Sequence, residues 1–410
     1  MSNDAIVGGS GHLGDRLARL RRLADLTQES LSERSGVSVD VIRKLEPHRK
    51  HSVRLPTLHK LATGLGVEVT GLLGDPPALS AEQDESPALV AIRRAIMPSP
   101  LAPTPEPDSA EPLSLDLLRA EIAEGWTLYH AAEFGQLTRS LPEIIDDARI
   151  AVAVGPRDQR ETAQAALGKA LQLGGHLAIR LGKTDLALSS LERGLRAADS
   201  GDDPLLAPMV SNSIAWAYQR QNRLADSQRL AVHAADGVER NGLRTANQVR
   251  VWGALLMAAA RSIGVTADYE RASDILEVAE TATERLATLP PSTNGKLVSV
   301  FSRSAVRIER VRLAVQHGQP DTALFLARGI RLSSDTPPSW RTWLMLDIAR
   351  ARTDVGDVEG AVKALQTVER RAPQWIRHHT LAVAIVRDLW AGRARPPGLR
   401  RLAEILGVID

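Results

Sequence analysis

Residues 26–46, LTQESLSERSGVSVDVIRKLE, decide the fold of the N-terminal part of the chain. Thr27 is a suitable N-cap for a short helix that carries Leu31, because a threonine side chain accepts a hydrogen bond from a free amide of the first turn. Gly36 permits a tight turn, and Val37 behind it is expected to be buried. The stretch therefore predicts a short helix, a tight turn and a second helix.

Ser38 is the expected cap of this second helix, whose inward face we expect to be Val41 or Ile42 together with Leu45. Upstream, residues 13–24 predict another helix, with one apolar stripe made of Leu13, Leu17, Leu20 and Ala24. The side chains left on the exposed face of the second helix are Val39, Asp40, Arg43 and Lys44.

This pattern resembles the helix-turn-helix of the Cro/phage-repressor (Xre-like) family. Further residues that match the family are Leu58, Leu61, Ala62, Leu65, Gly66, Val67, Leu72 and Leu73. The resemblance covers residues 13–74 and implies a five-helix DNA-binding domain. The alternative is a bundle of the same shape that contacts only protein; the cationic exposed face favours DNA.

In the family, the third helix lies in the major groove and its early residues contact base edges. Transferred to this sequence, the DNA-facing residues are Gln28, Ser38, Val39, Asp40, Arg43 and Lys44. Arg43 suits guanine, whereas Asp40 suits cytosine or orients Arg43. The residues of the following loop that suit phosphates are Arg49, Lys50 and Arg54.

Residues 75–112 are rich in proline and acidic residues and are expected to form a linker, interrupted by one short helix over residues 88–97. Residues 1–12 are expected to be a flexible tail. Gly9, Gly11 and Gly14 match the spacing of a dinucleotide-binding motif, but no strand–helix–strand pattern follows them, so we do not expect a nucleotide site.

Residues 113–410 are expected to form an α-solenoid of helical hairpins. Similar turn motifs lie 40 residues apart at Gly182 and Asn222 and 38 apart at Gly318 and Gly356. The 96 residues between Asn222 and Gly318 leave room for two longer copies, and periods of this size are typical of stacked helix pairs. Each begins with a residue that tolerates the left-handed conformation, namely Gly182, Asn222, Gly318 or Gly356, and further turns are expected at Gly135 and near Gly264. The segments Trp216-Ala-Tyr218, Asn222, Ser227, Gly182 and Ala187 resemble degenerate tetratricopeptide repeats.

Polar residues at helical spacing within the repeats suggest a ligand groove. Asn212, Trp216 and Arg220 follow one another at intervals of four, and Asn247 and Arg250 open the next helix. Asn side chains there suit a peptide backbone, and Arg suits a carboxylate. The alternative is that Trp216 belongs to the repeat core and the polar residues form a solvated face.

Composition excludes several classes of protein. With 51 Lys and Arg against 49 Asp and Glu in 410 residues, the net charge is only +2, so DNA contact requires a local basic patch. The absence of cysteine excludes disulfides and thiolate metal sites. The sequence contains no phosphate loop, serine elbow or HExxH motif, and we expect neither an enzyme nor a metal or cofactor.

We therefore expect a cytoplasmic bacterial transcription regulator, since neither a membrane span nor a signal peptide is indicated. Its partners would be a double-stranded DNA operator, a second copy in a homodimer, and a peptide or small-protein effector on the repeats. The layout resembles quorum-sensing regulators with peptide-binding repeats, and also actinobacterial regulators through segments such as Trp126-Thr-Leu-Tyr129. The alternative is a helical-repeat scaffold whose DNA contact is secondary.

Overall fold

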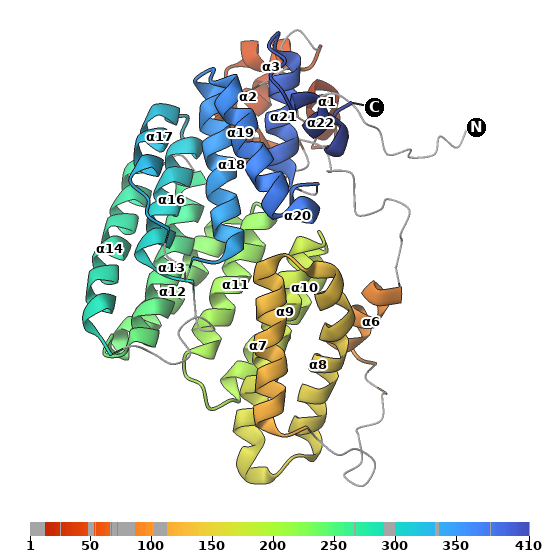
Figure 1. Ribbon diagram of the computed structural model, residues 1–410, viewed down its shortest axis with the longest axis vertical. Coiled ribbons are helices and arrows are strands. Elements are labelled where there is room, and N and C mark those ends of the chain that lie inside the picture. The colour runs from red at the N-terminus through yellow and green to blue at the C-terminus, as the bar shows by residue number, and fades with distance from the viewer. Residues whose placement is uncertain are drawn as a thin grey trace. The chain divides into compact units, whose positions relative to one another are not determined.

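The computed structural model describes residues 13–24, 26–47, 53, 55–65, 67, 72, 87–99, 101, 113–265, 268–290, 300–332, 336–377 and 379–409. All regular structure within these residues is helical (Figure 1), which confirms the all-α class. The chain divides into two compact units. One contains residues 1–78, 315–320 and 348–410, and the other contains residues 79–314 and 321–347.

The N-terminal helices of the first unit follow the predicted pattern. They are α1 (Leu13–Leu23), α2 (Gln28–Ser35), α3 (Val39–Leu45) and α4 (Leu55–Leu65). Of the fifth helix expected from the sequence, only Leu72 lies among the described residues, and its side chain is fully buried. The large side chains that form the core under these helices are Leu17, Leu31, Ile42, Leu45 and Leu61.

The turn between α2 and α3 has the predicted local structure. The Thr27 side chain accepts a hydrogen bond from the amide of Ser30 at 3.0 Å. Gly36 has φ +65°, in the left-handed region, and its amide donates to the carbonyl of Ser32. Ser38 is the N-cap of α3 but makes no side-chain capping bond. The predicted helix starts are therefore confirmed, while the Ser38 side chain remains available to other partners.

Two glycines allow the helices of this bundle to approach one another closely. A Cβ on Gly14 of α1 would overlap the carbonyl oxygen of Leu45 at the end of α3. A Cβ on Gly64 of α4 would lie 2.7 Å from the Cβ of Ser35 in α2. Gly14, the last glycine of the apparent dinucleotide motif, therefore allows α1 to pack closely against the end of α3.

From α7 to α14, consecutive helices pair into hairpins (Figure 1). In the second unit they are α7 (Leu115–Ala131), α8 (Phe134–Val154), α9 (Arg160–Arg180), α10 (Thr184–Asp199), α11 (Leu206–Arg220), α12 (Leu224–Arg240), α13 (Ala246–Val265) and α14 (Tyr269–Thr288), with a short 3₁₀ turn, η1 (Arg157–Gln159). Next come α16 (Arg303–Gln316), α17 (Pro320–Arg328) and α18 (Pro338–Asp354). The first unit ends with α19 (Val358–Arg371), α20 (Pro373–Arg377), α21 (Thr380–Ala391) and α22 (Leu399–Ile405).

The predicted turns of the hairpins are mostly confirmed. Gly182, Asn222, Gly318 and Gly356 all have positive φ and end the first helix of a pair. The turn predicted at Gly135 is wrong. Ala132 takes the left-handed position instead, since its amide caps α7 on the carbonyls of Leu128 and Tyr129, and Gly135 lies inside α8.

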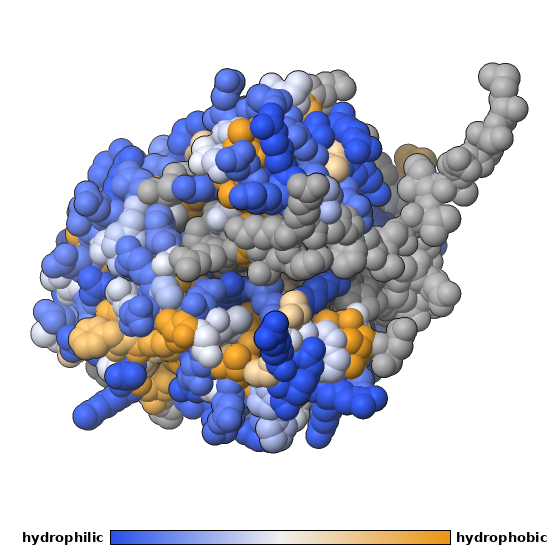
Figure 2. All heavy atoms as spheres, turned by 90° about the horizontal axis from the view of Figure 1, so that it is seen from above, coloured by the Kyte–Doolittle hydropathy of each residue, from blue (hydrophilic) through white to orange (hydrophobic). Residues whose placement is uncertain are grey.

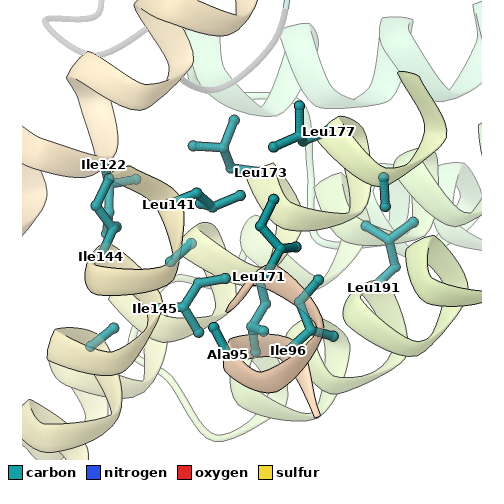
Figure 3. Packing of buried hydrophobic residues seen from close by; sticks show 14 of the residues in the cluster. Ala95, Ile96, Ile122, Leu141, Ile144, Ile145, Leu171, Leu173, Leu177 and Leu191 are labelled. Carbon is teal, nitrogen blue, oxygen red and sulfur yellow. The ribbon is translucent and has the colours of Figure 1, made fainter. Parts of the chain in front are cut away.

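One apolar core runs from α6 (Pro87–Ile96) through α11. Figure 3 shows Ala95 and Ile96 of α6 next to Ile145 of α8 and Leu171 of α9. The short helix that the sequence places inside the linker therefore packs on the repeats and covers their apolar first hairpins. Residues of α6 with buried side chains are Leu89, Ile92, Ala95 and Ile96.

The visible surface is largely hydrophilic with a few hydrophobic patches (Figure 2). Among the described residues, Phe325 on α17 is the most exposed aromatic side chain, at 73%. The helices that the structure describes include none with both the length and the apolar character that a membrane crossing requires.

Candidate DNA interface and inner face of the repeats

Helix α3 has one buried and one solvent-facing side. Ile42 and Leu45 are 0% and 1% exposed, so they anchor the helix to the bundle. The residues on its free side are Ser38, Asp40, Arg43 and Lys44, which are exposed, and Val39, which is partly buried. The helix therefore presents the side chains that the sequence assigned to base contacts, and it does so immediately after a rigid glycine turn.

Arg43 contacts helix α2 in this structure. Its Nη2 lies 2.6 Å from Oε1 of Glu29, and both side chains are more than half exposed. An exposed pair of this kind is screened by water and contributes little to stability. Arg43 can therefore exchange Glu29 for a base or phosphate at small cost.

Gln28 lies at the start of α2, partly buried, and donates from Nε2 to Oε2 of Glu46 at 2.6 Å. Arg21 of α1 holds the same carboxylate at both oxygens, at 2.6 and 3.0 Å. Burial alone raises the pKa of Glu46, but the hydrogen bonds from Arg21 and Gln28 hold it below its ordinary value. The hydrogen bonds of Glu46 to Arg21 and Gln28 connect the end of α3 to α1 and α2, and so fix the orientation of the exposed side of α3.

The three residues predicted to contact phosphates, Arg49, Lys50 and Arg54, lie outside the described residues.

The residues predicted for a ligand groove lie on α11 and α13. Trp216 is partly buried and its ring contacts His176 of α9 at 5.1 Å between centroids. Asn212 is partly buried and Arg220 is exposed. Arg250 donates to the carbonyl of Phe301 at 3.2 Å, which ties α13 to the segment before α16.

The amide oxygen of Asn247 is buried and has no hydrogen-bond partner among the described residues. Trp216 therefore packs on a ring of α9, and Arg250 bonds to the carbonyl of Phe301. A ligand groove formed by these residues stays a prediction.

The structure also shows a cluster that the sequence did not reveal, which we call the aromatic box. It consists of Arg180 and the rings around it: Trp126, Tyr129, His176, Trp216 and Trp343. The guanidinium carbon of Arg180 lies 5.7 Å from the centroid of Tyr129 and 5.0 Å from those of Trp216 and Trp343. Its Nε donates to the Tyr129 hydroxyl at 3.0 Å.

The box lies on the layer formed by the first helices of the hairpins. Helices α7, α9, α11 and α13 contact one another in succession, and each also packs on its own second helix. Helix α18 meets this layer, since Trp343 covers Arg180 and the Ser339 hydroxyl lies 3.5 Å from Nδ1 of His130. Side chains from helices far apart in the sequence therefore share one site.

A buried charge network adjoins the box. Arg261 of α13 holds Glu309 of α16 at 2.8 Å, and Arg312 bridges Glu309 to Asp347 of α18 at 3.3 and 3.2 Å. Burial raises the pKa of Asp347 to about 6, although Arg312 opposes the shift. Arg312 also lies 4.5 Å from the ring centroid of Trp343, on which Arg180 stacks too.

A weak signal for the box exists in the sequence. Gln172, His176 and Arg180 recur every four residues along the second half of α9, which is otherwise apolar from Ala170 onward, so they form one polar stripe. Which rings face that stripe depends on the pairing of distant helices and cannot be obtained from the spacing.

Comparison with known proteins supports the N-terminal assignment. Residues 12–72 match the helix-turn-helix domain family. The N-terminal part of the chain is therefore a helix-turn-helix domain.

Among solved structures, the chain is similar to that described as "Crystal Structure of Rap Protein Complexed with Competence and Sporulation Factor". The two share 12% identity over 72% of this chain and 87% of the other, with a TM-score of 0.45. None of the curated proteins matches this chain.

Proposed function

We propose that this protein is a sequence-specific DNA-binding transcription regulator of the Xre type, acting in the cytoplasm of a bacterium and not as an enzyme. The observation that carries the proposal is helix α3, anchored by Ile42 and Leu45 and presenting Arg43 and Lys44 from its last turn. The match of residues 12–72 to helix-turn-helix domains supports it. Such a helix reads base edges in the major groove.

The test is a map of binding sites in the host genome, followed by titration of a recovered site. Anisotropy at physiological salt should give a nanomolar Kd and strong preference over unrelated duplex. Binding with no sequence preference would contradict the proposal and favour a repeat scaffold with secondary DNA contact.

The regulator acts as a homodimer, because one helix-turn-helix module contacts too few base pairs for tight specificity. The repeats provide more surface for pairing than the DNA-binding domain. Light scattering of the full chain at micromolar concentration should give the dimer mass. A monomer would contradict this part of the proposal.

The repeats bind a peptide or small-protein effector along their first-helix layer. The supporting observations are the partly buried Trp216 and the unpartnered amide oxygen of Asn247. Binding would shift the arrangement of the two DNA-binding domains, which requires different affinities for two dimer states. Asn212→Ala or Arg220→Ala should weaken the response of a reporter to the effector while operator affinity stays unchanged. An unaltered response in both variants would contradict this groove.

A further inference from the structure

Within the described part of the chain, the charge of Arg180 has no counterion. Among the residues that the structure describes, no carboxylate forms an ion pair with Arg180, and its only hydrogen bond goes from Nε to Tyr129. Arg312 provides the internal comparison, because it stacks on the same Trp343 ring but is paired with Glu309 and Asp347. Both Nη groups of Arg180, the fork that binds planar anions, thus have no acceptor among the residues described.

The neighbouring imidazoles respond to this charge. Burial, together with the positive charge of Arg180, lowers the pKa of His130 to about 4 and that of His176 well below its ordinary value. Both imidazoles are therefore neutral near pH 7, and they add no positive charge to the box. Lys169, 5.7 Å from the Trp126 ring, has its pKa lowered to about 8 by burial.

Several polar atoms of the box, and one of Gln172, which lies two turns before Arg180 on α9, are buried without a partner among the described residues. They are Trp126 Nε1, Trp343 Nε1, His176 Nδ1 and Gln172 Oε1. An indole N–H only donates, so two of these atoms require an acceptor, whereas Gln172 Oε1 requires a donor. Gln172 cannot turn freely, because its Nε2 already donates to the carbonyl of Met209 and to Ser213. Unpartnered buried groups of this kind cost free energy unless a ligand satisfies them.

These observations specify the chemistry of the missing ligand. A carboxylate offers two acceptor oxygens in one plane, which matches the Nη fork. The surrounding rings form apolar walls that suit an organic group and disfavour a strongly hydrated inorganic anion. The last residue of a peptide carries such a carboxylate together with an organic side chain.

We propose that the aromatic box is a carboxylate-binding site in which Arg180 holds the C-terminal carboxylate of a peptide, with the last side chain among the rings. This inference rests on the peptide effector of the proposed function. A free small carboxylate, such as an acylated amino acid, has the same chemistry, and the experiment separates the two sources.

The experiment uses the full chain and calorimetric titration with three probes. The first is a pool of random hexapeptides with free C-termini, the second is the same pool with C-terminal amides, and the third is N-acetyl-leucine. The variants are Arg180→Gln, which removes the charge, and Arg180→Lys, which keeps the charge but loses the fork. Arg229→Gln, on the exposed side of α12, is the matched control. Tyr129→Phe serves as a second variant, because it releases Arg180 but keeps the ring that packs in the core.

We expect the free-acid pool to bind at least tenfold more tightly than the amide pool. Arg180→Gln should abolish this difference, Arg180→Lys and Tyr129→Phe should reduce it, and Arg229→Gln should preserve it. Equal binding of both pools, or a preference that survives Arg180→Gln, overturns the site but leaves a peptide effector in place. Binding of N-acetyl-leucine alone, lost in Arg180→Gln, keeps the carboxylate site and overturns the peptide source. Absence of binding by all three probes overturns the inference.

Discussion

Removal of the Glu46 charge should loosen the recognition helix. The carboxylate receives three hydrogen bonds, two from Arg21 and one from Gln28, and the Glu46 and Arg21 side chains are only 9% and 14% exposed. Glu46→Gln keeps the shape but places an amide group against these donors. Breaking a buried pair costs about 3–5 kcal/mol, and since glutamine retains one acceptor we expect about 2–3 kcal/mol.

The assay is hydrogen exchange of the full chain, followed by mass spectrometry of peptides from α1 to α3. A loss of about 2–3 kcal/mol corresponds to roughly 30- to 150-fold faster exchange where exchange follows opening of the bundle. The matched control is Glu29→Gln, which breaks the exposed pair with Arg43 and should change exchange less than about fivefold. Equal effects of the two substitutions would refute the structural role of the hydrogen bonds between Glu46, Arg21 and Gln28.

Three further outcomes are expected. Gly253→Ala should destabilise the repeats by about 1–3 kcal/mol in urea unfolding, since its Cβ would overlap the buried Phe301 ring. Gly237→Ala, with open space around the new Cβ, should stabilise the repeats by about 0.5–1 kcal/mol. A neutral Gly253→Ala would contradict the packing. The pKa of His130 is about 4 in the folded chain and 6.5 in the unfolded chain, so its contribution to the free energy of unfolding is present above pH 6.5 and is lost as the pH falls toward 4. His130→Gln should therefore reduce the pH dependence of the free energy of unfolding in this range, by at most about 1.4 kcal/mol per pH unit. An unchanged pH dependence in His130→Gln would contradict this assignment. Lys50→Ala should weaken binding to all duplexes alike and reduce its salt dependence, and a sequence-dependent loss would exclude a phosphate contact.

The N-terminal fold could be predicted because its signals are local. Thr27, Gly36 and Val37 each act within one turn of their own position, and the structure has the N-cap, the left-handed turn and the buried valine as expected. The repeat turns at Gly182 and Gly356 follow from the same local rule. The rule failed at Gly135 because a non-glycine residue, Ala132, occupies the left-handed position.

The aromatic box could not be predicted because its partners are distant in sequence. Tyr129 and Arg180 are separated by 51 residues, and Trp343 lies on a helix of a different hairpin. Helical periodicity assigns each side chain to a face of its own helix, but only the curvature of the stacked hairpins determines which faces meet. The same limit explains why the Glu29 contact of Arg43 was not anticipated.

The most direct test of the central claim, that the exposed face of α3 reads DNA bases, is a comparison of two proteins on one operator. Affinities of the wild-type chain and of Arg43→Ala are measured on the recovered operator and on all its single-base variants. The account predicts that Arg43→Ala loses about 1–3 kcal/mol on the operator and loses base preference at one position of each half-site. Unchanged operator affinity and base preference in Arg43→Ala, and in the double variant with Lys44→Ala, would contradict it.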